Sequence, residues 1–230
     1  MLRRRSPLVQ VCLALLVVAA SGCGGDEDPG DERAGQVRTA ALDAGLDGDV
    51  ADFLALAARG QSATYQVTYP GPDERSELVV ANDPPNRRVD VVVDERVVEV
   101  QLVLDGEAFQ CTRASDADGI SSCERTDAVV DAPGLFSERS LTEVTESLRD
   151  RADDFTFRVQ TVPVAGVEAT CLVTEIREGR ARSDLGSTGT ICVSAEGALL
   201  KVDRDGETLE AREYTTEVPD NSFVRPDQQS

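Results

Sequence analysis

The chain has no histidine and no tryptophan, and aromatic residues make up only 4% of its 230 residues. Without histidine it cannot build a Ser-His-Asp triad, a Cys-His nucleophile or a histidine-ligated zinc site. The single lysine, Lys201, lies between Leu200 and Val202, which predicts an outward-facing strand position rather than a Ser-Lys dyad. We therefore expect a protein that is not an enzyme.

Metal and cofactor motifs are also lacking. The Asp-Gly sequences at Asp118 and Asp205 do not continue into the twelve-residue calcium loop with its bidentate glutamate, and Asp-Gly is a common hairpin turn pair. The 43 acidic residues offer many carboxylate pairs, so no single pair stands out as catalytic. No metal and no cofactor are expected.

Long hydrophobic runs are scarce, and the one present lies at the start of the chain. Arg3, Arg4 and Arg5 precede an apolar stretch of 13 residues, 8–20. A helix of that length spans about 20 Å, which is short of the ~30 Å core of a bilayer. The segment therefore predicts a signal peptide over residues 1–22 rather than a membrane span.

The residues that follow, Ala20, Ser21, Gly22 and Cys23, resemble the lipobox of bacterial lipoproteins. The resemblance implies cleavage before Cys23 and a diacylglycerol on its thiol, which places the protein at the outer face of the bacterial cytoplasmic membrane. The alternative is an ordinary signal peptide that is cut nearby, with Cys23 incidental. Residues 23–36 are rich in glycine and charge and predict a flexible acidic tether behind the lipid.

Basic residues are few. Removing residues 1–22 takes away three arginines and no acid, which leaves 20 basic and 43 acidic side chains and a formal charge of −23. Such a surface repels nucleic acid and anionic lipid headgroups, so membrane attachment must come from acyl chains on Cys23. The charge indicates either a basic or cationic partner, which the sequence does not name, or a solvated surface, and we favour the solvated surface.

Four cysteines remain once Cys12 leaves with the signal peptide and Cys23 takes the lipid. An even number in an exported domain indicates two disulfides, for which three pairings exist. Cys111 and Cys123 flank a turn-rich loop, and Cys171 and Cys192 flank a longer polar loop. We predict the pairs 111–123 and 171–192, each contributing about 3 kcal/mol to stability.

Hydrophobic periodicity divides the rest of the chain into helices and strands. A helix with a candidate cap at Asp49 is expected to end at Gly60, with an earlier turn of helix around 37–42. A further helix is expected over 138–152. Alternating residues, with turns at Asp105-Gly106, Ala165-Gly166 and Asp205-Gly206, predict antiparallel strands. The expected strands cover residues 63–69, 78–80, 89–93, 98–104, 109–111, 120–125, 155–162, 167–176, 190–195, 198–203 and 207–218.

The predicted fold class is α+β. About 10–11 strands should form one strongly bent antiparallel sheet, a half-barrel, because a large sheet with one apolar face must curl. Two or three helices should cover its apolar side. We expect a single domain over residues 37–224 and a polar tail over 225–230.

This order of elements behind a lipobox resembles the LolA-like lipoprotein carriers. Ala63-Thr64-Tyr65 and Asn82-Asp83-Pro84-Pro85 lie where the first and second strands of that family would be. The family includes mycobacterial lipoproteins that carry lipids, and the resemblance covers most of residues 37–224. It implies a half-barrel that wraps around helices and encloses an apolar cavity for acyl chains.

Two functions follow from this interpretation. In the first, the protein binds or carries a lipid or another hydrophobic ligand in the half-barrel. In the second, the same residues pack into a solid core, and the protein is a surface module that binds another envelope component. The residues expected to line the cavity are Val67, Val91, Val100, Leu102, Leu141, Val144, Leu148, Phe157 and Val159.

Overall fold

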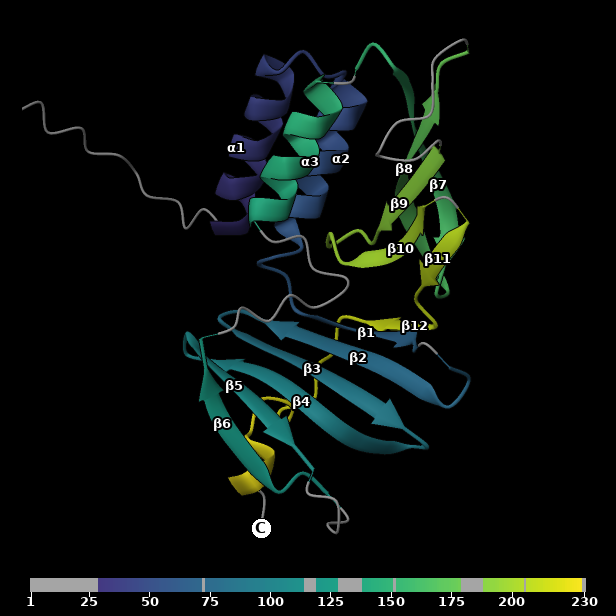
Figure 1. The fold of residues 1–230 in the computed structure, drawn as a ribbon. Helices are drawn as coiled ribbons and strands as arrows, with labels where there is room; N and C mark the ends of the chain where they lie inside the picture. The colour runs from purple at the N-terminus through teal and green to yellow at the C-terminus, as the bar shows by residue number, and fades with distance from the viewer. Residues whose placement is uncertain are drawn as a thin grey trace, which may run out of the picture.

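The computed structural model describes residues 29–71, 73–113, 119–127, 138–150, 152–178, 188–204 and 206–228. Within these residues, three α-helices accompany two antiparallel sheets, of seven and five strands. Figure 1 shows the helices side by side next to the five-stranded sheet, with the seven-stranded sheet below them. The α+β class predicted from the sequence is confirmed, but the strands form two curved sheets where the sequence predicts one.

The first two helices, α1 (Pro29–Asp43) and α2 (Gly48–Arg59), form an antiparallel hairpin. The apolar residues of α2 recur at helical spacing and are buried, from Val50 to Ala58. The N-cap of α2 is Asp47, and the predicted cap Asp49 lies in the first turn, where its charge favours the helix dipole. The third helix, α3 (Glu138–Asp150), follows the predicted range closely.

The predicted tether is too long at its C-terminal end, because residues 29–36 belong to α1. Pro29 suits a helix start, and Asp31 and Glu32 lie in the first turn, near the positive end of the dipole. Asp31 pairs with Arg59 of α2 at 3.0 Å, and Ala34 is 5% exposed. Contacts with α2 therefore extend a helix that the local composition alone does not indicate.

The seven-stranded sheet has the order β12-β1-β2-β3-β4-β5-β6. It is a meander except at one edge, where the last strand of the chain pairs with the first. Its strands are β1 (Tyr65–Pro70), β2 (Ser76–Asp83), β3 (Asn86–Val93), β4 (Arg96–Leu104), β5 (Glu107–Thr112), β6 (Ser122–Thr126) and β12 (Glu213–Thr215).

The five-stranded sheet has the order β11-β10-β9-β8-β7, again between chain neighbours. The predicted strand over 207–218 is divided: β11 ends this sheet, and β12 joins the other. The chain thus passes from one sheet to the other at Ala211, which is buried. The strands are β7 (Phe155–Val164), β8 (Val167–Ile176), β9 (Thr188–Val193), β10 (Leu199–Arg204) and β11 (Glu207–Glu210).

Tight hairpins connect many of the strands. Two consecutive residues have positive φ at Asp105-Gly106 and at Ala165-Gly166, as two-residue turns with the right-handed strand twist require. Both turns were predicted from their glycines. A third such turn, Asp94-Glu95, contains no glycine and was not predicted.

The two sheets share an apolar core. Tyr65, Val67 and Tyr69 of β1 pack against Cys171 of β8 and Leu200 of β10. A second cluster joins α2 to the other face of the five-stranded sheet, and a third lies on the outer face of the seven-stranded sheet around Phe109. Each sheet is therefore covered on both faces over part of its area.

Candidate functional site

Strand register separates the residues that were predicted to line one cavity. Val80 lies opposite Val67 and Val89, so the odd-numbered valines of β3, including Val91, share a face with Val67. Val100, however, lies opposite Asp90, so it faces the other side of the sheet. The prediction that Val67, Val91, Val100 and Leu102 share an inner face is therefore wrong.

Three of these four residues belong to the core, and none of the four lines the apolar groove between α3 and the five-stranded sheet. Val67 is 1% exposed and belongs to the core between the sheets. Val100 and Leu102 are fully buried in the cluster on the outer face, where Phe223 also packs. Val91 is half-buried. At these positions the solid-core interpretation of the sequence is the better one.

The other predicted residues lie elsewhere, between α3 and the five-stranded sheet. Val144, Leu148, Phe157 and Val159 pack together against the α2 cluster. The first three of them line an apolar groove with a volume of about 200 Å³. Leu141 is part of α3, but its side chain lies outside what the structure describes.

The floor of this groove, which we call the α3 groove, is one face of the sheet. Phe155 and Phe157 come from the edge strand β7, while Leu172, Ile191 and Val202 lie opposite one another on β8, β9 and β10. Cross-strand pairing brings these side chains to one face because paired residues share it. Val144 and Leu148 of α3 cover the floor.

One end of the α3 groove is polar. Thr174, Gly189 and Arg204 are paired across β8, β9 and β10, and Asp203 also borders the groove. Thr174 Oγ1 donates to the carbonyl oxygen of Gly189 at 3.2 Å. A Cβ atom on Gly189 would lie 3.1 Å from Thr174 Oγ1, so this glycine leaves room at the polar end.

Two larger hollows beside α1 have charged side chains among their lining residues. The hollow between α1 and α3 has a volume of about 350 Å³, and Arg33, Gln61 and Arg149 are among its lining residues. The hollow between α1 and α2, about 440 Å³, is crossed by the Arg38–Asp52 ion pair at 2.6 Å. Charged groups in these hollows already pair within the protein, as Arg33 does with Gln61 and Arg38 with Asp52, so we take the α3 groove as the candidate site.

A partly buried polar cluster lies away from this groove. Ser194 is 1% exposed and donates to Glu196 at 3.0 Å, while the Tyr214 hydroxyl donates to the same carboxylate. Burial raises the pKa of Glu196, but hydrogen bonds from Tyr214, Ser194 and its own backbone N–H outweigh burial and lower the pKa. Burial and Glu196 raise the pKa of Tyr214. Every group has a partner, which favours a structural role.

Two core tyrosines are held in their neutral form. Burial raises the pKa of Tyr65 and of Tyr69 far above the ordinary value. The Tyr69 hydroxyl donates to the carbonyl oxygen of Leu199 and so joins β1 to β10. The Tyr69 hydroxyl thus links the two sheets, and neither tyrosine titrates near neutral pH.

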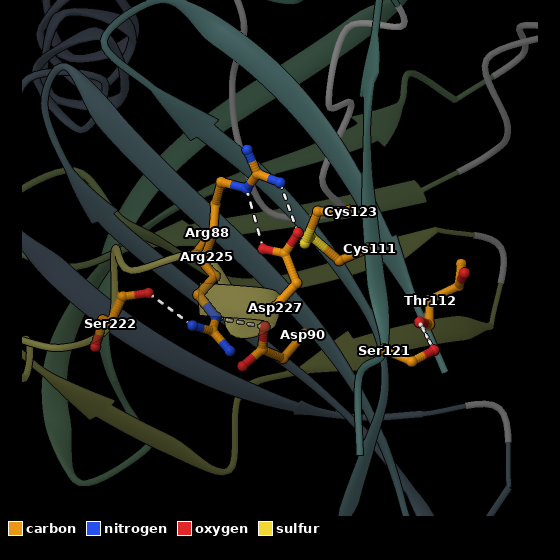
Figure 2. The surroundings of a disulfide bond; sticks show 9 residues. All are labelled: Arg88, Asp90, Cys111, Thr112, Ser121, Cys123, Ser222, Arg225 and Asp227. Atoms are coloured by element: carbon orange, nitrogen blue, oxygen red, sulfur yellow. Dashed lines mark hydrogen bonds and ion pairs between the residues drawn. A yellow bond between two sulfur atoms is a disulfide. The ribbon is translucent and has the colours of Figure 1, made fainter. Parts of the chain in front are cut away.

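Both predicted disulfides are present in the structure. Cys171 joins Cys192 across β8 and β9, with both residues fully buried between the sheets. Cys111 joins Cys123 across β5 and β6, on the outer face of the seven-stranded sheet (Figure 2). Each bond links directly paired residues of one hairpin, as the local sequence indicates.

The described residues contain no group of three or more His, Cys, Asp or Glu side chains placed to hold a metal ion. The helices of the described part of the chain are all too short or too polar to cross a membrane. Cys23 and the predicted signal peptide lie outside the described residues.

The fold and the groove define an α+β protein of two antiparallel sheets with a disulfide in each and an apolar groove under one helix. No protein-family model matches the sequence, and no curated protein matches it either. Among solved structures, the chain is similar to the lipoprotein LppX of Mycobacterium tuberculosis, at 13% identity and a TM-score of 0.33. The match covers 73% of this chain and 97% of LppX, and similarity at this level assigns no family.

Proposed function

We propose that the protein is a lipid-anchored, extracytoplasmic lipoprotein that binds a single apolar chain in the α3 groove. The observation that carries the binding proposal is the groove itself, with aromatic and aliphatic side chains on the sheet and aliphatic side chains on α3. A hydrocarbon chain placed there would lose its contact with water, which is favourable by about 25 cal/mol for each Å² buried.

The size of the groove limits the ligand. Pockets for drug-sized molecules have volumes of about 300–1,000 Å³, and the α3 groove has about 200 Å³. One acyl chain or a part of it fits that volume better than a lipid with several chains. The polar end, with Asp203 and Arg204, would leave a headgroup in contact with water.

The proposed location rests on separate support. The arginines and apolar run at the start of the chain, followed by Cys23 behind three small residues, are typical of exported lipoproteins. Two disulfides agree with an oxidising compartment outside the cytoplasm. The strong negative charge disfavours attachment to anionic lipids through the protein surface.

The binding proposal is tested with a fluorescent acyl probe, dansyl-undecanoate, and residues 24–230 expressed in an oxidising compartment. Because the chain has no tryptophan, Ile191→Trp both fills the floor of the groove and introduces one reporter. We expect this variant to bind the probe at least about tenfold more weakly than the wild type, since its indole occupies the ligand volume.

The matched control is Leu42→Trp, which places the same side chain on α1 at a position that is 39% exposed and outside the groove. It should bind the probe as the wild type does. Equal affinity of both variants, or no binding by the wild type, would exclude the groove as an acyl site.

A second function is favoured by the burial of Val67, Val100 and Leu102, each at most 1% exposed. These residues form a solid core, as a surface module without a ligand would require. If the wild type binds no acyl probe, the protein is better interpreted as a tethered module that contacts another component of the envelope.

A further inference from the structure

The C-terminal segment forms a second, polar pocket with the outer face of the seven-stranded sheet. Residues 219–222 cross over β1, β2 and β3 and enclose a volume of about 210 Å³. The sheet contributes Gln66, Ala81, Arg88 and Asp90, which cross-strand register places on one face. We call this volume the strap pocket.

A largely buried ion pair lies in the strap pocket. Arg88 Nε donates to Asp90 Oδ1 at 2.7 Å, and the two side chains are only 14% and 16% exposed. Arg88 Nη1 also donates to the carbonyl oxygen of Ser222 at 2.8 Å, which fixes the C-terminal segment over the sheet (Figure 2). Burial raises the pKa of Asp90 despite the opposing effect of Arg88, so this carboxylate is poorly solvated.

Several polar groups of this pocket have no partner among the residues that the structure describes. Among the described residues, nothing pairs with Arg88 Nη2, with Asp90 Oδ2 or with the side-chain amides of Gln66 and Asn221. Yet no fully buried side-chain nitrogen or oxygen of the described residues lacks a hydrogen bond. The unpaired groups therefore keep some exposed surface, and all four residues line the strap pocket.

The charge balance defines the class of that molecule. Arg88 and Asp90 neutralise each other, so a ligand with net charge would be left unpaired in a largely buried site, at a high cost in free energy. A hydroxyl group both donates and accepts, so one ligand hydroxyl can donate to Asp90 while its neighbour accepts from Arg88. Amides such as Gln66 and Asn221 offer both functions to further hydroxyls.

We propose that the strap pocket binds an uncharged, hydroxyl-rich ligand of about monosaccharide size. Ala81 and Val79 offer an apolar floor for the carbon skeleton of such a ligand, and the volume of about 210 Å³ excludes much larger molecules. The pocket is on the sheet that does not form the α3 groove, so this proposal stands independently of acyl binding.

The test is a titration of residues 24–230, labelled with ¹⁵N and expressed in an oxidising compartment, with D-glucose, myo-inositol and glycerol, followed by NMR. We expect at least one of the three to cause saturable shifts in the side-chain amide signals of Gln66 and Asn221, with a Kd on the order of 1 mM. Gln66→Met keeps the shape of the side chain but removes its amide, and should weaken binding about tenfold.

The matched control is Gln101→Met, the same change on the opposite face of the sheet, where Gln101 bonds to Glu99. It should leave the affinity unchanged. Asn221→Ala, in the C-terminal segment, provides a second variant that leaves the sheet intact, and it should also weaken binding. The proposal is overturned if none of the three probes causes a saturable shift, if Gln66→Met and Gln101→Met bind equally, or if acetate or glycine binds more tightly.

Discussion

At the scale of single residues, the proposed membrane anchor rests on Cys23. Cys23 follows three small residues and the apolar stretch 8–20, and the strong negative charge of the remaining chain disfavours binding to an anionic membrane through the protein surface. Stable anchoring needs two acyl chains, and the diacylglycerol expected on this thiol supplies both. Loss of the thiol should therefore abolish membrane anchoring.

We expect Cys23→Ala to release the protein from membranes into the soluble extracytoplasmic fraction. Fractionation followed by immunoblotting measures the change, and intact-mass analysis of the wild type should show added acyl mass on a chain that starts at residue 23. Cys12→Ala, within the signal peptide, is the matched control and should stay in the membrane fraction. Continued membrane retention of Cys23→Ala would refute the anchor.

At the scale of elements, the end of α2 packs directly against the turn between β9 and β10. A Cβ atom on Gly60 would overlap the carbonyl oxygen of Gly197, and one on Gly197 would overlap the carbonyl oxygen of Leu56. Gly197 also has a φ of +87°, which side chains disfavour. Two facing glycines therefore set the distance between this helix and the five-stranded sheet.

We predict that Gly197→Ala lowers the free energy of unfolding by about 2–4 kcal/mol, because overpacking and left-handed strain add together. Gly35→Ala is the control: it lies within α1, and an added Cβ would meet no atom within 4 Å. That variant should be more stable than wild type by about 0.5–1 kcal/mol. Urea unfolding followed by circular dichroism measures both. Equal stability of the two variants would contradict the close packing of Gly197 against the end of α2.

At the scale of the whole molecule, a few polar contacts join the two sheets. Tyr214 belongs to β12 of the larger sheet, and Glu196 lies in the turn between β9 and β10 of the smaller one. The Ser194 hydroxyl donates a hydrogen bond to the Glu196 carboxylate and accepts one from the backbone N–H of Glu196, which completes the cluster. The cluster therefore couples the attachment of β12 to the ionisation of one carboxyl group.

This coupling predicts a pH dependence of stability. The pKa of Glu196 is lower in the folded protein than its ordinary value of 4.5, so its ionised form stabilises the fold above about pH 4.5. That contribution is lost as the pH falls through the lowered folded pKa. The difference in urea midpoint between wild type and Glu196→Gln should therefore shrink between pH 6 and pH 3.

Glu175→Gln removes the same charge from an exposed position on β8 and serves as the control, since its side chain has no hydrogen bond to Tyr214. Its difference from wild type should depend less on pH than that of Glu196→Gln. If both variants show the same pH dependence, the hydrogen bonds of the polar cluster do not account for it, and Glu196 affects stability only through the net charge of the protein.

The sequence by itself determined the features that depend on neighbouring residues. The hairpin at Asp105-Gly106, the burial stripe of α2 and the pairing of Cys171 with Cys192 all follow from local spacing, because turn chemistry and periodicity act over a few residues. The groove residues Val144, Leu148 and Phe157 were also found from the sequence, since amphipathic elements bury their apolar sides.

Only the tertiary structure decided which elements meet. Alternation along β3 and β4 does not show that Val91 and Val100 face opposite sides, because a shift of one residue in register reverses every side chain. The crossing of the chain at Ala211 from one sheet to the other, and the C-terminal segment over Arg88, depend on contacts between distant residues. Such long-range pairing is set by the packing of the whole molecule and leaves no local pattern.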